Sequence, residues 1–158
     1  MNAIDKAVSY LNIKPRTRAQ VEKYLKDKGY EHSEIEEAVT SLQDYNYIDD
    51  LNFARMYFEL GFEKGRGTAR ISRELAEKGV PRDVINRAYQ ELESVPDQYE
   101  MALDIGRNIV ESSLQGRDIS ELDYEAVHKL QAKIARRLAS RGFEGDIVYR
   151  VAGECTRR

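Results

Sequence analysis

A helix-ending signature, Leu-x-x-x-Gly followed by a large apolar residue, occurs three times in this chain and limits the folds open to it. Each glycine stands where a helix would end with a residue at positive φ, which only glycine adopts without steric cost. The flanking leucine and apolar residue have the spacing of the contact that closes such a helix end. The copies are Leu25-Lys-Asp-Lys-Gly29-Tyr30, Leu75-Ala-Glu-Lys-Gly79-Val80 and Leu138-Ala-Ser-Arg-Gly142-Phe143. Such repetition is typical of a tandem array of similar units.

The similarity extends over a whole unit on both sides of each glycine. Apolar residues recur at matching distances from the three glycines: Val21, Ile35, Ala38 and Leu42, then Ile71, Ile85, Ala88 and Leu92, then Ile134, Val148, Val151 and Cys155. These spacings follow one face of a helix before the glycine and of another after it. A further amphipathic helix precedes each pair. We therefore expect an all-α fold, an elongated array of three tandem three-helix repeats with helix-turn-helix-like units, over residues 2–46, 47–94 and 95–158.

Capping residues predict where several helices begin. Thr17 with Gln20, and Ser33 with Glu36, have the spacing of a capping box. Asp49 or Asp50 is placed to cap the first helix of the second repeat. The stretch from Ser112 to Asp123, which contains Gly116, is expected to be a long loop.

Composition argues against several classes of protein. The sequence has no apolar run long enough to span a membrane and no signal-peptide pattern at its start. Its single cysteine, Cys155, allows no internal disulfide, so we expect a protein of the reducing cytoplasm. Because Cys155 falls in the apolar register, it is expected to be a small buried hydrophobe, and not a reactive thiol.

The basic residues gather around the second helix of each repeat, although the net charge is −3. One interpretation is an ordinary solvated helical surface. The other is a repeated basic edge that faces an acidic or nucleoprotein partner, and it makes these residues the candidate partner-binding site. The three clusters are Lys14, Arg16 and Arg18; Lys64, Arg66, Arg70 and Arg73; and Lys133, Arg136, Arg137 and Arg141.

The sequence carries no recognisable catalytic or metal-ligating pattern. His32 and His128 are far apart, and neither has a cysteine or a second histidine nearby. The segment from Gly65 to Thr68 resembles a phosphate-binding loop but lacks the Gly-Lys-Ser/Thr ending, so a connection between helices is the better interpretation. We expect a protein that is not an enzyme and that holds neither cofactor nor metal.

The ten tyrosines suggest base stacking as one possible use. Tyr10, Tyr57 and Tyr89 occupy apolar helical registers, however, and are expected to be half-buried. Tyr45 and Tyr47 lie between the first two repeats and are expected to pack neighbouring repeats together.

The run from Tyr47-Ile-Asp-Asp50-Leu-Asn-Phe-Ala54 through Gly65-Arg-Gly67-Thr-Ala-Arg70 to Gly79-Val80 is the most specific of three segments that resemble the RecX family. Arg16-Thr17-Arg18 is similar to the first-repeat motif of that family, and Arg137-Leu138 to Gly142-Phe143 to its C-terminal one. Leu60 and Gly61, which stand where arginine is common in the family, and the long stretch after Ser112 depart from the pattern.

This resemblance implies tandem three-helix repeats and a regulator of the RecA recombinase. The partners it implies are RecA and the RecA filament on single-stranded DNA, whose ATP hydrolysis and strand exchange the protein would limit, acting as a monomer. The alternative is direct DNA binding through the helix-turn-helix-like pairs, with weak contact to single strands beside the main role. Against sequence-specific binding, the candidate recognition helices begin with acidic residues such as Glu34, Asp83 and Asp146.

Overall fold

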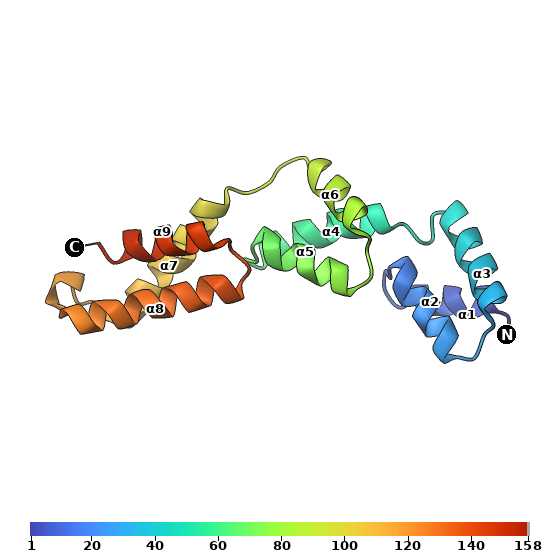
Figure 1. Cartoon of the computed structure of the whole chain (residues 1–158), viewed down its shortest axis with the longest axis horizontal. Helices are drawn as coiled ribbons and strands as arrows, with labels where there is room; N and C mark the ends of the chain where they lie inside the picture. The colour runs from blue at the N-terminus through green and yellow to red at the C-terminus, as the bar shows by residue number, and fades with distance from the viewer. Residues whose placement is uncertain (158) are drawn as a thin grey trace. The chain divides into compact units, whose positions relative to one another are not determined.

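The structure, a computed structural model, describes residues 1–157. Over this range the chain forms nine α-helices and one short 3-10 helix, η1, with no β-strand (Figure 1), which confirms the all-α prediction. No helix within residues 1–157 is long and apolar enough to cross a membrane. In chain order the helices are α1 Ala3–Leu11, α2 Arg18–Asp27, α3 His32–Asp44, α4 Asp50–Glu63, α5 Thr68–Glu77, α6 Arg82–Gln90, α7 Gln98–Leu114, η1 Ile119–Glu121, α8 Tyr124–Ser140 and α9 Gly145–Cys155. We call α1–α3, α4–α6 and α7–α9 the first, second and third triplets.

The three predicted glycine stops end α2, α5 and α8. Gly29, Gly79 and Gly142 have φ values of +90°, +88° and +93°. In each copy the residue after the glycine donates its N–H to the carbonyl of the signature leucine, at 3.1 to 3.2 Å, and the glycine N–H donates to the carbonyl one residue further on, at 3.0 Å. This pair of bonds is the Schellman motif, which satisfies carbonyls that a helix end would otherwise leave unpaired.

The chain divides into two compact units, each with its own apolar core. The first unit holds residues 1–59 and 72–93, and the second holds residues 60–71 and 94–158. In the first unit α1, α2 and α3 pack on one another around fully buried Val21 and Leu25. In the second, α7, α8 and α9 pack around Ile134, Leu138 and Val151. Since each such side chain contributes about 1.5–3 kcal/mol when fully buried, these faces hold the helices together.

The capping residues predicted from the sequence are observed at the starts of α2 and α4 but not at the start of α3. Thr17 and Gln20 form the predicted capping box ahead of α2. Asp49 caps α4 by accepting the N–H of Asn52 at 3.0 Å. The box predicted from Ser33 and Glu36 was wrong, because α3 starts at His32 and the Glu34 carboxylate instead accepts the N–H of Glu31 at 3.1 Å.

The long connection after α7 is shorter than predicted. Ser112 and Ser113 still belong to α7, which ends at Leu114 with Gln115 and Gly116 at positive φ. The 3-10 helix follows, and Asp123 then caps α8 by accepting the N–H of Ala126 at 2.8 Å.

The tyrosines divide between half-buried and exposed positions. Tyr10 and Tyr57 are half-buried, as their apolar registers predict, and Tyr89 is 39% exposed. Tyr45 and Tyr47 are 75% and 59% exposed, so the prediction that they pack repeats together was wrong. Ile48, directly after them, is the buried residue of this connection at 2% exposure.

Candidate functional site

The start of α2 docks on the end of α5 within the first unit. Thr17 Oγ1 donates a hydrogen bond of 2.6 Å to the backbone carbonyl of Lys78. A Cβ added to Gly79 would lie only 2.2 Å from the Cβ of Ala19, so the two backbones approach more closely than any side chain at position 79 would permit. We call this contact, formed by Thr17, Ala19, Lys78 and Gly79, the first junction.

The same contact recurs within the second unit, between the start of α5 and the end of α8. The N–H of Gly67 donates a hydrogen bond of 2.7 Å to the carbonyl of Arg141. A Cβ added to Gly142 would lie 2.1 Å from the Cβ of Arg70. This second junction is formed by Gly67, Arg70, Arg141 and Gly142.

The two junctions are equivalent in sequence as well as in geometry. Thr17 and Gly67 both stand twelve positions before the glycine stop of their own triplet, and each donates to the carbonyl just before the stop of the next triplet. Gly79 and Gly142 therefore each have two roles. Each ends its helix at positive φ, and because it has no Cβ, the start of the second helix of the preceding triplet can pack closely against it. Gly29 has the same backbone conformation but no atom within 4 Å of its Cβ position.

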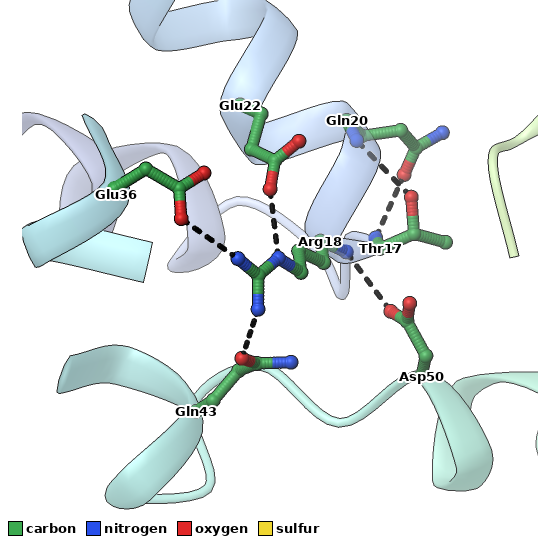
Figure 2. Close-up of polar contacts among 7 residues, drawn as sticks. All are labelled: Thr17, Arg18, Gln20, Glu22, Glu36, Gln43 and Asp50. Atoms are coloured by element: carbon green, nitrogen blue, oxygen red, sulfur yellow. Dashed lines mark hydrogen bonds and ion pairs between the residues drawn. The ribbon is translucent and has the colours of Figure 1, made fainter. Parts of the chain in front are cut away.

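Beside the first junction, Arg18 is held in a polar network that joins α2, α3 and the start of α4 (Figure 2). Its Nε donates to Glu22 at 2.7 Å and its Nη2 to Glu36 at 3.3 Å, while its Nη1 donates to Gln43. Its backbone N–H donates to Asp50 Oδ1 at 2.9 Å. Because all three guanidinium nitrogens have partners inside the first unit, this geometry favours a structural role for Arg18.

Asp50 is affected by the same network. Burial raises the pKa of the Asp50 carboxyl above its ordinary value, and this outweighs the opposing hydrogen bond from the Arg18 N–H and the attraction to the Arg18 charge. The charged form of the Asp50 side chain is therefore destabilised by desolvation, although it accepts a hydrogen bond from the Arg18 N–H at the start of α2.

The remaining candidates of the first cluster differ from Arg18. Lys14 is exposed. The Arg16 guanidinium lies over the ring of Tyr10, with its carbon 4.1 Å from the ring centroid.

The second junction brings parts of the second and third basic clusters together. Arg70 Nη1 donates to the carbonyl of Ser140 at 3.4 Å. A Cβ at Gly65 would lie 2.9 Å from Arg141 Nη1, so the loop that carries Lys64 and Arg66 runs beside the end of α8. Four cationic residues from segments some 70 positions apart, Lys64, Arg66, Arg70 and Arg141, therefore lie near one another in the second unit. Guanidinium groups gathered in this way suit carboxylate or phosphate groups of a partner.

The other candidates are exposed on helix surfaces. Arg73 is exposed and pairs with Glu77 at 3.9 Å. Lys133 is exposed and donates to Ser113 Oγ at 3.3 Å, while Arg136 and Arg137 are exposed on α8.

Within residues 1–157 no group of three or more His, Cys, Asp or Glu side chains could hold a metal ion. His128 Nε2 lies 2.8 Å from the hydroxyl of Tyr124, with both side chains at the surface of α8. Burial raises the pKa of the half-buried Cys155 thiol, which disfavours the reactive thiolate, in line with the apolar role predicted for this residue.

Sequence reasoning missed the residues that form the junctions. Thr17 was predicted as a cap but not as the donor to Lys78, and Gly67 was predicted only as part of a connection. A signal was present, since Thr17 and Gly67 share one position relative to the glycine stops. The contact of Arg16 with Tyr10 had no signal, because the two residues lie on different elements.

The helix triplets, glycine stops and repeated junction together define a tandem three-helix protein. Comparison with known families finds "RecX, first three-helix domain" over residues 3–42 and "RecX, second three-helix domain" over residues 49–88. These two matches cover half of the chain. The chain belongs to the RecX family.

Similar proteins carry the same family name. The "Regulatory protein RecX" of Lactobacillus johnsonii is 28% identical over 147 residues, which cover 92% of this chain and 51% of that protein. The one from Listeria monocytogenes serotype 4a is 29% identical over 154 residues, or 97% of this chain and 54% of that protein. This chain thus spans about half the length of these relatives. The crystal structure of RecX from Lactobacillus salivarius is similar with a TM-score of 0.78 and 25% identity, over 97% of this chain and 94% of that one.

Proposed function

We propose that this chain binds the RecA recombinase and its filament on single-stranded DNA, and that it restrains ATP hydrolysis, filament growth and strand exchange. The observation that carries this proposal is membership of the RecX family, whose relatives are named regulatory proteins. In this proposal the chain acts as a monomer in the cytoplasm, without catalysis of its own, in recombination and DNA repair.

The cationic surface supports the proposal. The cluster near the second junction combines Lys64, Arg66, Arg70 and Arg141 from two triplets, and Lys14 and Arg16 lie in the first. Several modest contacts on one chain bind a repetitive partner more tightly than any one contact alone, since the first contact raises the effective concentration of the others. A filament offers the same surface on each protomer and so suits this mode of binding.

The test measures the DNA-dependent ATPase activity of the cognate recombinase in the presence of substoichiometric amounts of this protein. A variant in which Lys64, Arg66 and Arg73 are changed to Gln should inhibit less than wild type at low salt, and the difference between the two should shrink as salt is raised, because salt screens electrostatic contacts. Arg70 and Arg141 are left intact because they form the second junction. The control changes Lys23, Lys26 and Arg87 to Gln, which removes the same charge outside the clusters. Wild-type protein without effect on ATPase, strand exchange or filament length would refute the function, and equal inhibition by the two variants would refute a partner-binding role for the second basic cluster of the sequence, to which Lys64, Arg66 and Arg73 belong.

Direct DNA binding is the second candidate, and the cluster near the second junction is the observation that favours it. Acidic residues oppose a helix-turn-helix mode, because Glu34, Asp83 and Asp146 lie in the first turns of α3, α6 and α9. Those are the helix ends that would face bases and phosphates. A gel shift without recombinase, repeated at increasing salt, measures any such binding, and its dependence on salt reports the number of phosphate contacts.

A further inference from the structure

A column of stacked side chains crosses the surface of the first triplet. The rings of Tyr10 from α1 and Tyr24 from α2 are parallel within 1°, with centroids 3.9 Å apart. The Arg16 guanidinium lies 4.1 Å from the Tyr10 centroid, and the Lys28 ammonium lies 5.5 Å from that of Tyr24. Since two rings at 3.9 Å leave no room between them, Arg16 covers the opposite face of Tyr10. No base can therefore stack on Tyr10.

Arg16 has an unmet hydrogen-bonding capacity that Arg18 lacks. Its Nε is buried without a hydrogen-bond partner, and Arg16 forms no ion pair with any residue in the described part of the chain. Two positions further on, Arg18 donates from all three guanidinium nitrogens. Of these two arginines, Arg18 thus has all of its guanidinium nitrogens bonded, whereas the two Nη groups of Arg16 form no hydrogen bond or ion pair with the described residues.

The stack prepares Arg16 for binding. A guanidinium held against an aromatic face is attracted by the ring and keeps its planar set of donors in a fixed plane. An unrestrained arginine would lose side-chain freedom on binding, and this cost is reduced when the group is already ordered. A planar carboxylate can take two N–H donors from such a guanidinium, and in Arg16 these come from Nη1 and Nη2 because Nε is buried.

We infer that Arg16 is the anion-binding residue of the first triplet and that it takes a single, isolated carboxylate from the protein partner. This inference rests on the proposed function. The charge around Arg16 favours an isolated carboxylate over a nucleic-acid strand: residues 2–46 contain seven Lys and Arg but eight Asp and Glu. A run of phosphates would be repelled by these acids, and the ring face that a base would need on Tyr10 is covered. Tyr10 is a positioning residue that acts through Arg16.

The test measures binding to recombinase filaments assembled on single-stranded DNA, with bare single-stranded DNA as the second arm. Arg16→Ala should weaken filament binding about 10-fold, the typical value of one hydrogen bond to a charged group. Arg16→Lys, which keeps the charge but not the planar donors, should also weaken it. Tyr10→Phe keeps the ring and should bind like wild type, whereas Tyr10→Leu keeps Arg16 but removes its support and should bind more weakly.

Each outcome decides between the alternatives. Arg16→Ala binding as tightly as wild type would overturn the inference while leaving the proposed function intact. Equal losses on filaments and on bare DNA would assign Arg16 to phosphate and overturn the carboxylate assignment. Failure of wild-type protein to bind filaments would remove the proposed function and this inference with it. Thermal melting by circular dichroism identifies any variant that unfolds, and Arg16→Lys and Tyr10→Phe, the mildest changes, then still decide the question.

Discussion

Replacing a glycine stop by alanine should have different consequences at Gly29 and at Gly79. Both residues have φ near +90°. Alanine in this region costs about 1–2 kcal/mol in either place, because its Cβ approaches the following carbonyl. Gly29→Ala is therefore a matched control that carries the backbone penalty alone, since nothing lies within 4 Å of its Cβ position.

The structure adds a second cost at Gly79. The new Cβ would lie 2.2 Å from the Cβ of Ala19. Carbon atoms prefer separations of about 3.5–4.0 Å, so the first junction would have to open. Opening it breaks the 2.6 Å bond from Thr17 Oγ1 to the Lys78 carbonyl, a net loss of about 1 kcal/mol. We therefore expect a destabilisation of about 1–2 kcal/mol for Gly29→Ala and about 2–3 kcal/mol for Gly79→Ala.

Urea denaturation followed by circular dichroism measures both free energies of unfolding. Ala19→Gly should partly rescue Gly79→Ala by restoring space, although glycine inside a helix itself costs up to about 1 kcal/mol. A double-mutant cycle isolates the coupling between positions 19 and 79. Equal destabilisation by Gly29→Ala and Gly79→Ala, together with a coupling near zero, would refute the junction.

Two further predictions concern the network around Arg18. Arg18→Ala should destabilise the protein by about 1–2 kcal/mol, because it removes three partly buried, charge-assisted hydrogen bonds. Lys23→Ala, which removes the exposed ion pair of Lys23 with Asp27, should cost less than about 0.5 kcal/mol. Equal destabilisation by the two variants in urea denaturation would contradict a stabilising role for the network. Asp50→Asn keeps the acceptor for the Arg18 N–H and removes the ionisable group. Because the folded pKa of Asp50 is raised, the folded state binds more protons than the unfolded state as pH rises from about 3.9, the unfolded value, through the folded pKa. Wild-type stability should fall over this window relative to Asp50→Asn, and a constant difference from pH 3 to 7 would show that the carboxyl is not desolvated.

The sequence predicted the local features of this fold because their causes are local. The glycine stops depend on the φ of one residue and on bonds within six positions, and all three form as expected. The capping box predicted at Ser33 and Glu36 was wrong because a second box, formed by Glu31 and Glu34, is possible two residues earlier. The residue pattern alone does not show which of the two boxes starts the helix. Helix limits are the least certain part of such reasoning, as the extension of α7 to Leu114 shows.

The candidate site was harder to predict from the sequence than the fold, because it depends on contacts between segments that are distant in the chain. The basic residues were visible in the sequence, but their partners were not. Arg16 and Arg18 differ by two positions and have the same formal charge, yet one stacks on Tyr10 from α1 and the other is neutralised by Glu22 and Glu36. Likewise Tyr45 and Tyr47 were predicted to be packing residues, and only the fold shows that they are exposed and that the neighbouring Ile48 is buried.

The second junction has a consequence for how such proteins diverge. Its hydrogen bond joins a backbone N–H to a backbone carbonyl, and its close approach depends on glycines at positions 67 and 142. Almost any side chain at position 141 would supply the same carbonyl. The contact therefore places strict demands on two residues and very few on the rest, so substitutions can accumulate around it without loss of the arrangement. Sequence change in this fold is therefore expected to spare positions 67 and 142 while it alters the residues around them.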